Sequence, residues 1–173
     1  GLNANTNYYF KISSINSGGE SPASTPVSIL TICSAPTTLG YTALTDSSAT
    51  VTWNSVSGAT KYLIYTSANN ANYQLADSSF VNNVNIRLLL PSTKYYFKIS
   101  AFNNSGESAL SATCSLTTIP SPPSNISATA LSSTQILLDW ETVPAANAYF
   151  IFSSSSSGTL PYLQTANSPP CTI

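Results

Sequence analysis

The chain has 173 residues, enough for one large domain or two small ones, and 42% of them are hydrophobic, as in a folded protein. Only 6% are charged and the formal net charge is −1, so no basic surface for a nucleic acid is expected. No apolar run approaches the ~18 residues that a membrane-spanning helix needs. Polarity carried by Ser, Thr and Asn, with ten Tyr and no His or Met, favours a secreted or cell-surface β-rich protein.

The sequence reads as short strands separated by turns, and no helical periodicity is present. In chain order, strands are expected in the central part at 49–53, 61–66, 84–89, 95–102 and 110–118. Turns rich in Ser, Asn, Asp and Gly separate them, at 45–48, 57–58, 68–70 and 103–106. This density of short strands is typical of a β-sandwich.

The chain repeats itself with a period of about 87 residues. A shift by 87 positions places Trp53 on Trp140 and Tyr62 on Tyr149 without a gap. The same shift places residues 6–13 on 93–100, and both segments read Thr-x-Tyr-Tyr-Phe-Lys-Ile-Ser. Each repeat therefore predicts the same set of strands.

The repeat resembles the fibronectin type III family. The central copy carries Trp53 and then Leu89-x-Pro91-x-Thr93-x-Tyr95-x-Phe97-x-Ile99 and Asn103-x-x-Gly106-x-Ser108. The first copy matches with Leu2, Thr6, Tyr8, Phe10, Ile12, Asn16, Gly19 and Ser21, and has Ala4 where the pattern has proline. The resemblance covers essentially the whole chain and implies an all-β fold of tandem seven-stranded, immunoglobulin-like β-sandwiches.

The resemblance also implies roles for particular aromatic residues. Tyr8 and Tyr95 should be tyrosine corners, whose hydroxyls bond the backbone a few residues upstream. The residues expected in the structural core are Trp53, Trp140, Tyr8, Tyr95, Phe10 and Phe97.

The linkers predict three segments. Residues 34–119 form a complete module, between the openings Ser-Ala-Pro at 34–36 and Pro-Ser-Pro-Pro at 120–123. Residues 1–33 hold only the last two strands of a module, F and G. Residues 120–173 hold the first strands of a further module, from A to the start of E.

The two partial modules are expected to complete each other between copies. Strand F must lie beside strand C, and the central module already has its own strand F, so residues 1–33 should pack on 120–173 of a neighbouring copy. The expected contacts join Tyr8, Phe10 and Ile12 to Trp140, Tyr149 and Ile151.

If Ile173 is joined to Gly1, the joined sequence continues the repeat and is one residue short of two periods. The chain therefore looks like a window cut from a longer series of repeats. Three origins of this window are open. A longer polypeptide repeats the two-module unit, separate subunits exchange strands, or the boundary is arbitrary. The continuous repeat is preferred because the cut falls in a turn without the extension that a donor strand usually has.

No residue pattern indicates catalysis, a cofactor or a metal. The chain has no His, so a Ser-His or Cys-His nucleophile pair is not available. Asp139 and Glu141 flank Trp140 and are expected to share a surface, which is far more often a solvated face than a glycosidase site. We therefore predict that the chain is not an enzyme.

The cysteines are expected to be buried free thiols, because Cys114 and Cys171 take the repeat positions of Val27 and Val84. A bond between Cys33 and Cys114 is the alternative.

Other short patterns concern the surface. The two Asn-x-Ser patterns make Asn103 and Asn125 candidate glycan acceptors. No Arg-Gly-Asp occurs in the F–G turns.

These observations predict a structural or adhesive segment of an extracellular fibre, filament or stalk. Its partners are copies of itself, with surface proteins or polysaccharides as further candidates. Two alternatives stay open: spacer or sugar-binding modules of a secreted polysaccharide-degrading enzyme, and a cell-surface receptor ectodomain.

Overall fold

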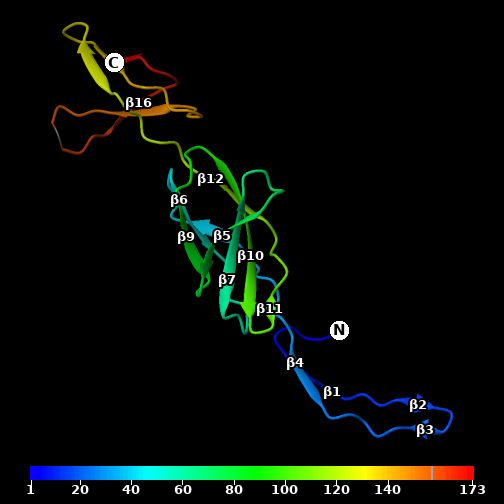
Figure 1. Cartoon of the computed structure of the whole chain (residues 1–173). Helices are drawn as coiled ribbons and strands as arrows, with labels where there is room; N and C mark the ends of the chain where they lie inside the picture. The colour runs from blue at the N-terminus through cyan, green and yellow to red at the C-terminus, as the bar shows by residue number, and fades with distance from the viewer. Residues whose placement is uncertain (157) are drawn as a thin grey trace. The chain divides into compact units, whose positions relative to one another are not determined.

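The computed structural model of the chain describes residues 1–156 and 158–173 (Figure 1). Every regular element in these residues is a β-strand, which confirms the predicted all-β class. The chain forms two compact units. The first comprises residues 1–44, 48–88 and 94–117, and the second comprises 45–47, 89–93 and 118–173.

Two antiparallel sheets form the centre of the first unit. One sheet has the order β5–β6–β9, with bounds Gly40–Thr42, Ser48–Thr52 and Asn83–Arg87. The other has the order β11–β10–β7–β8, with β12 also beside β10; its bounds are Gly106–Glu107, Lys94–Asn103, Lys61–Ser67, Gln74–Ser79 and Cys114–Thr117.

The core of this sandwich follows from the alternation along its strands. Buried residues alternate with partly exposed ones in β6 and over the first half of β7, which places the apolar side chains of each strand on one face. Val51, Ile64, Phe97 and Ile99 are buried in this way. Trp53 comes one residue after the end of β6 and is buried as well.

Strand β12 is shorter than the sequence predicts. A strand was expected at 110–118, whereas the ladder runs over Cys114–Thr117. Before β12, serine hydroxyls bond the neighbouring strand: Ala101 N donates to Ser108 Oγ and Ile99 N donates to Ser111 Oγ. These hydroxyl bonds replace part of the regular ladder.

The first 33 residues of the first unit form a long hairpin. Strand β1 (Asn7–Phe10) pairs with β4 (Val27–Leu30), and β2 (Ile15–Asn16) pairs with β3 (Gly19–Glu20). Each residue pair in these ladders matches a pair of β10 with β12 or β11, displaced by 87 positions. The repeat seen in the sequence is therefore also a repeat of strand register.

The second unit has two small sheets. One has the order β13–β14–β17, with bounds Ser127–Ala130, Ile136–Asp139 and Cys171–Thr172. The other pairs β15 (Tyr149–Phe152) with β16 (Tyr162–Ala166). Its core cluster consists of Trp140, Val143, Tyr149, Ile151 and Ala166.

The tryptophan environments of the two units repeat closely. The rings of Trp53 and Tyr62 are 5.2 Å apart at 66°, and those of Trp140 and Tyr149 are 5.1 Å apart at 62°. The Tyr62 hydroxyl accepts a hydrogen bond from Val56 N at 2.8 Å. The Tyr149 hydroxyl accepts the matching bond six residues upstream, at 2.9 Å.

Candidate functional site

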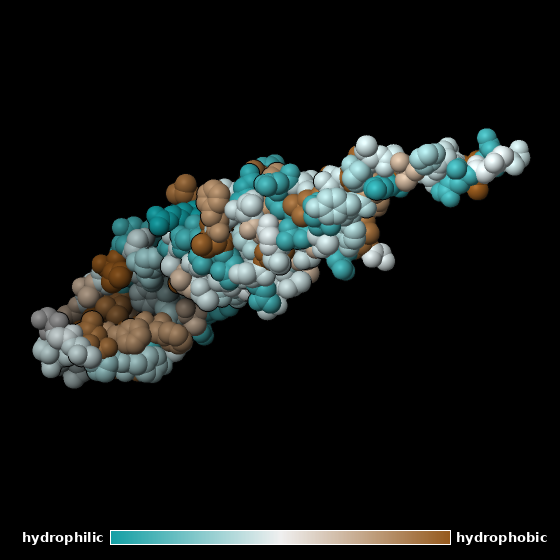
Figure 2. All heavy atoms as spheres, turned by 90° about the horizontal axis from the view of Figure 1, so that it is seen from below, coloured by the Kyte–Doolittle hydropathy of each residue, from teal (hydrophilic) through white to brown (hydrophobic). Residues whose placement is uncertain are grey.

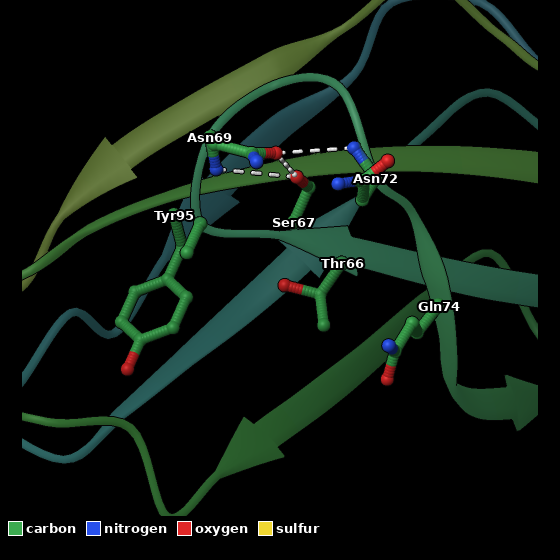
Figure 3. A pocket seen from close by; sticks show the side chains of 7 residues that line it. Thr66, Ser67, Asn69, Asn72, Gln74 and Tyr95 are labelled. Atoms are coloured by element: carbon green, nitrogen blue, oxygen red, sulfur yellow. Dashed lines mark hydrogen bonds between the residues drawn. The ribbon is translucent and has the colours of Figure 1, made fainter.

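A pocket of about 360 Å³ lies where β7 ends, in the sandwich of the first unit (Figure 3). Thr66 and Ser67 line it from β7, Asn69 and Asn72 from the following turn, and Tyr95 from β10. No lysine, arginine, aspartate or glutamate lines it. The pocket therefore offers hydrogen bonds and an aromatic ring, but no carboxylate, ammonium or guanidinium group.

The side-chain oxygen of Asn69, one of the residues that line this pocket, already accepts hydrogen bonds within the turn. Asn69 Oδ1 accepts hydrogen bonds from Ser67 Oγ at 2.9 Å and from the amides of Ala71 and Asn72, both at 3.0 Å. These bonds close an Asn-centred turn, the conformation in which an asparagine side chain stands in for a backbone carbonyl. We assign the pocket a structural role.

One carboxylate in the first unit has a defined partner set. Glu107 Oε1 accepts hydrogen bonds from Tyr65 Oη at 2.7 Å and from Ser100 Oγ at 2.6 Å. Burial, followed by the bond to Glu107 and its charge, raises the pKa of the Tyr65 phenol. A phenol held more firmly in its neutral form serves as a donor here and not as a nucleophile.

Asp139 and Glu141 have separate structural partners. Asp139 Oδ1 accepts a hydrogen bond from the backbone of Trp140 at 3.0 Å. Glu141 Oε2 accepts bonds from Ser124 Oγ at 2.7 Å and Asn125 Nδ2 at 3.0 Å. Each carboxylate thus stabilises its own stretch of backbone or loop.

The two candidate glycan acceptors differ in environment. Asn125 is exposed. Asn103 is buried, and its Nδ2 donates to the carbonyl of Thr31 at 3.0 Å and to Asn5 Oδ1 at 3.3 Å. Because a glycan would be attached through this nitrogen, the folded first unit makes Asn103 unsuitable as an acceptor, which corrects that part of the prediction.

All three cysteines are free thiols, so the alternative bond between Cys33 and Cys114 is not formed. Cys33 is buried, whereas Cys114 and Cys171 are only partly buried, which corrects the expectation that both are fully enclosed. Burial raises the pKa of the Cys33 and Cys114 thiols, which lowers the fraction of reactive thiolate at neutral pH.

The second unit exposes an apolar hollow of about 180 Å³, visible as the brown region around a depression in that unit (Figure 2). Trp140, Tyr149 and Ile151 line it and also belong to the core cluster. Its other lining residues are Pro123, Ile126, Leu138, Phe150 and Phe152. The core of the second unit therefore has an accessible side.

The hairpin of residues 1–33 exposes the side chains that its repeat buries. Phe10 is 43% exposed and Ile12 76%, whereas Phe97 and Ile99 are both 0% exposed. Tyr8 is partly buried, and its hydroxyl accepts a hydrogen bond from Asn3 N at 2.8 Å, five residues upstream. This is the geometry of a tyrosine corner. The expected contacts of these residues with a neighbouring copy stay a prediction.

Comparison with known families identifies the sandwich of the first unit. The family model "Fibronectin type III domain" matches residues 34–117, inside the expected module of residues 34–119. Residues 34–117 are a fibronectin type III domain. Fibronectin type III domains are generally non-catalytic modules.

Other proteins resemble the fibronectin domain and its flanks. The chain is 31% identical over 135 residues to receptor-type tyrosine-protein phosphatase F of Danio rerio, covering 73% of this chain but only 7% of that protein. Among solved structures, an Fn3-like protein from Clostridium thermocellum is 27% identical, with a TM-score of 0.45 and coverage of 49% of this chain and 91% of that one. A beta-1,2-glucanase from Parabacteroides distasonis is 26% identical, with a TM-score of 0.47 and coverage of 52% and 13%.

Within residues 1–156 and 158–173, no group of three or more His, Cys, Asp or Glu side chains could hold a metal ion. No helix long and apolar enough to cross a membrane occurs in the same residues.

Proposed function

We propose that the chain is a structural segment of an extracellular fibre, filament or stalk built from tandem fibronectin type III-like modules. The observation that supports this is the repetition of strand register: β1, β2, β3 and β4 match the ladders of β10 with β11 and β12, displaced by 87 positions. Modules that repeat at a fixed sequence period can be propagated along one direction, as a linear assembly requires.

The composition supports a mechanical or adhesive role. With 6% charged residues and a net charge of −1, neighbouring fibres repel each other little. The surface is kept polar by Ser, Thr and Asn, which hydrogen-bond to water or to another such surface. Fibronectin type III domains are typical of extracellular proteins, and we propose the outside of the cell as the location.

A receptor ectodomain is the second candidate. The 31% identity over 135 residues to a receptor-type tyrosine-protein phosphatase favours it. In a receptor, the modules would act as spacers in front of a membrane anchor, and isolated modules would not assemble into filaments.

Negative-stain electron microscopy of the purified 173-residue protein over a concentration series tests the fibre. We expect filaments that lengthen with concentration. Strand β10 has 10 residues, which at ~3.3 Å each span ~33 Å, so two modules should give an axial repeat of ~60–80 Å. Particles that stay monomeric at all concentrations would contradict the fibre and favour the receptor.

A further inference from the structure

Strand β15 of the second unit is paired on one side only within the residues that the structure describes. In the fibronectin domain, the equivalent strand β7 pairs with β8 on one side and with β10 on the other. Strand β15 pairs with β16 on one side. Within residues 1–156 and 158–173, no strand pairs with its other side. The backbone groups along that edge are therefore available to a further strand.

The surface next to this edge is apolar. Trp140, Tyr149 and Ile151 belong to the core cluster and also line the hollow of about 180 Å³. In the fibronectin domain, the equivalent residue Ile64 pairs with Ile99 of β10, and both are fully buried. In the fibronectin domain, β10 thus pairs with β7 and covers the apolar side chains beside it. In the second unit the equivalent apolar side chains line an accessible hollow.

The hairpin of residues 1–33 is the part of this chain that is built like β10 and its neighbours. Besides the shared register, its hydroxyl bonds repeat: Ile12 N donates to Ser24 Oγ at 3.2 Å and Ser14 N donates to Ser21 Oγ at 3.1 Å. In the fibronectin domain, Ile99 N and Ala101 N donate to serines at the equivalent positions, at 3.0 and 2.9 Å. The hairpin therefore already has the shape that would dock on β15.

We propose that the free side of β15 binds residues 1–33 of a second copy of this chain, which adds β1 and the residues after it as the next strand. The inference rests on the proposed fibre, since it names the contact that would join one unit to the next. Displacing the β10–β7 register by 87 positions gives the pairing: Ile12 opposite Ile151, Lys11 opposite Phe152 and Ser14 opposite Tyr149.

The side chains of the two surfaces are complementary in this register. Phe10, Ile12 and Ile29 are exposed on the hairpin, and docking would remove them from water together with the hollow beside Trp140 and Ile151. Among the residues that line the hollow none is charged, so no like-charge repulsion opposes the docking. A polar or charged ligand would lack partners in this hollow, which favours an apolar strand as its occupant.

Two blocked variants test the docking in the full chain. Ile12→Asp places a charge on the hairpin, and Ile151→Asp places one in the hollow; either charge would have to be buried in the contact. By analytical ultracentrifugation we expect the wild type to form oligomers beyond the dimer and each variant alone to be monomeric. An equimolar mixture should form a 1:1 heterodimer and nothing larger, because one intact hairpin meets one intact hollow. Phe80→Asp, at an exposed turn residue outside both surfaces, is the matched control and should assemble like the wild type.

Disulfide cross-linking tests the register without placing a charge in the core, in case Ile151→Asp fails to fold. In a background with Cys33→Ser, Cys114→Val and Cys171→Val, Lys11→Cys in one copy should cross-link with Phe152→Cys in another under mild oxidation. Phe150→Cys, two residues away on the same exposed face, is the out-of-register control and should cross-link at least tenfold less.

A mixture of the blocked variants that stays monomeric would overturn the docking. So would cross-linking that is equal at Phe150→Cys and Phe152→Cys, or preferential cross-linking of Lys11→Cys to Tyr65→Cys of the fibronectin domain. Filaments that persist in Ile12→Asp would also overturn it while leaving the proposed fibre intact. A heterodimer from the blocked variants without filaments in the wild type would leave the docking intact and contradict the fibre.

Discussion

The hairpin of residues 1–33 and its repeat in the fibronectin domain have the same ladder but opposite environments. Tyr8 and Phe10 have ring centroids 6.5 Å apart at 31°, and Tyr95 and Phe97 have the same separation at 33°. Ile29 is 57% exposed, whereas its repeat Leu116 is 3% exposed. Local hydrogen bonds and side-chain neighbours therefore set the shape of this hairpin, and the rest of a sandwich decides only whether its apolar face is covered.

The largest difference in stability is expected when the equivalent aromatic ring is removed from each hairpin. Phe97→Ala should lower the free energy of unfolding of the fibronectin domain by ~3–5 kcal/mol, because it leaves a cavity in a closed core. Phe10→Ala, the matched control, should leave the unfolding of that domain unchanged at concentrations where the chain is monomeric. Urea titrations followed by circular dichroism measure both. Equal losses would mean that the first hairpin is part of the domain's core.

A smaller effect is expected from the serine hydroxyls. Ser111 Oγ accepts the amide of Ile99 in a buried setting, so Ser111→Ala should cost ~1–3 kcal/mol by leaving that amide without this acceptor. Ser24→Ala removes the same bond from the exposed amide of Ile12, which water can satisfy, and should cost less than ~0.5 kcal/mol. Unfolding titrations and amide hydrogen exchange at Ile99 report the difference. A cost for Ser24→Ala as large as that for Ser111→Ala would show that burial is not the deciding factor.

The smallest effect concerns pH. Burial and Glu107 raise the pKa of Tyr65 in the folded state above that of the unfolded chain, which is ~10. The stability contributed by this phenol is therefore fully present below about pH 10 and is lost as the pH rises through the folded-state pKa. The stability difference between the wild type and Tyr65→Phe should shrink as the pH rises above about 10.

Strand β15 of the second unit gives the control for this titration. Phe152 takes the repeat position of Tyr65 and has no ionisable group. Glu20, in the hairpin of residues 1–33, takes the repeat position of Glu107, and its carboxylate accepts a hydrogen bond from Ser13 Oγ. A Phe152→Leu variant should show the same pH dependence as the wild type over that range. A difference between wild type and Tyr65→Phe that is constant with pH would contradict the role assigned to the bond with Glu107.

Much of the fold could be predicted because the sequence carries each signal twice. The period of 87 positions predicted which residues are equivalent, and the repeated Trp–Tyr geometry agrees with it. Strand β8 escaped the prediction because Gln74–Ser79 reads Gln-Leu-Ala-Asp-Ser-Ser, which does not alternate. Its pairing is supplied by β7, a neighbour whose own pattern is strong.

The environment of single polar residues could not be predicted. The pattern at Asn103 suggested an accessible glycan acceptor. Its side chain is instead buried, and its Nδ2 donates a hydrogen bond to the carbonyl of Thr31, 72 positions away. Cys114 lies at a position where the repeat has Val27, and the exposure of the two depends on neighbours that differ between the two hairpins. Such contacts arise between segments distant in sequence, and a local pattern does not encode them.

The register that the hairpin shares with β10 and β12 affects how the chain folds when other copies are present. The hairpin of residues 1–33 has the same ladder register as β10 and β12, so hydrogen bonding alone does not distinguish a chain's own strand β10 from the hairpin of another molecule as the partner of β7. What distinguishes them is the covalent tether, which holds β10 near β7 at a local concentration on the order of millimolar, far above that of any free neighbour. Dilution during folding then favours the correct partner, whereas refolding at high protein concentration favours exchanged strands and tangled oligomers.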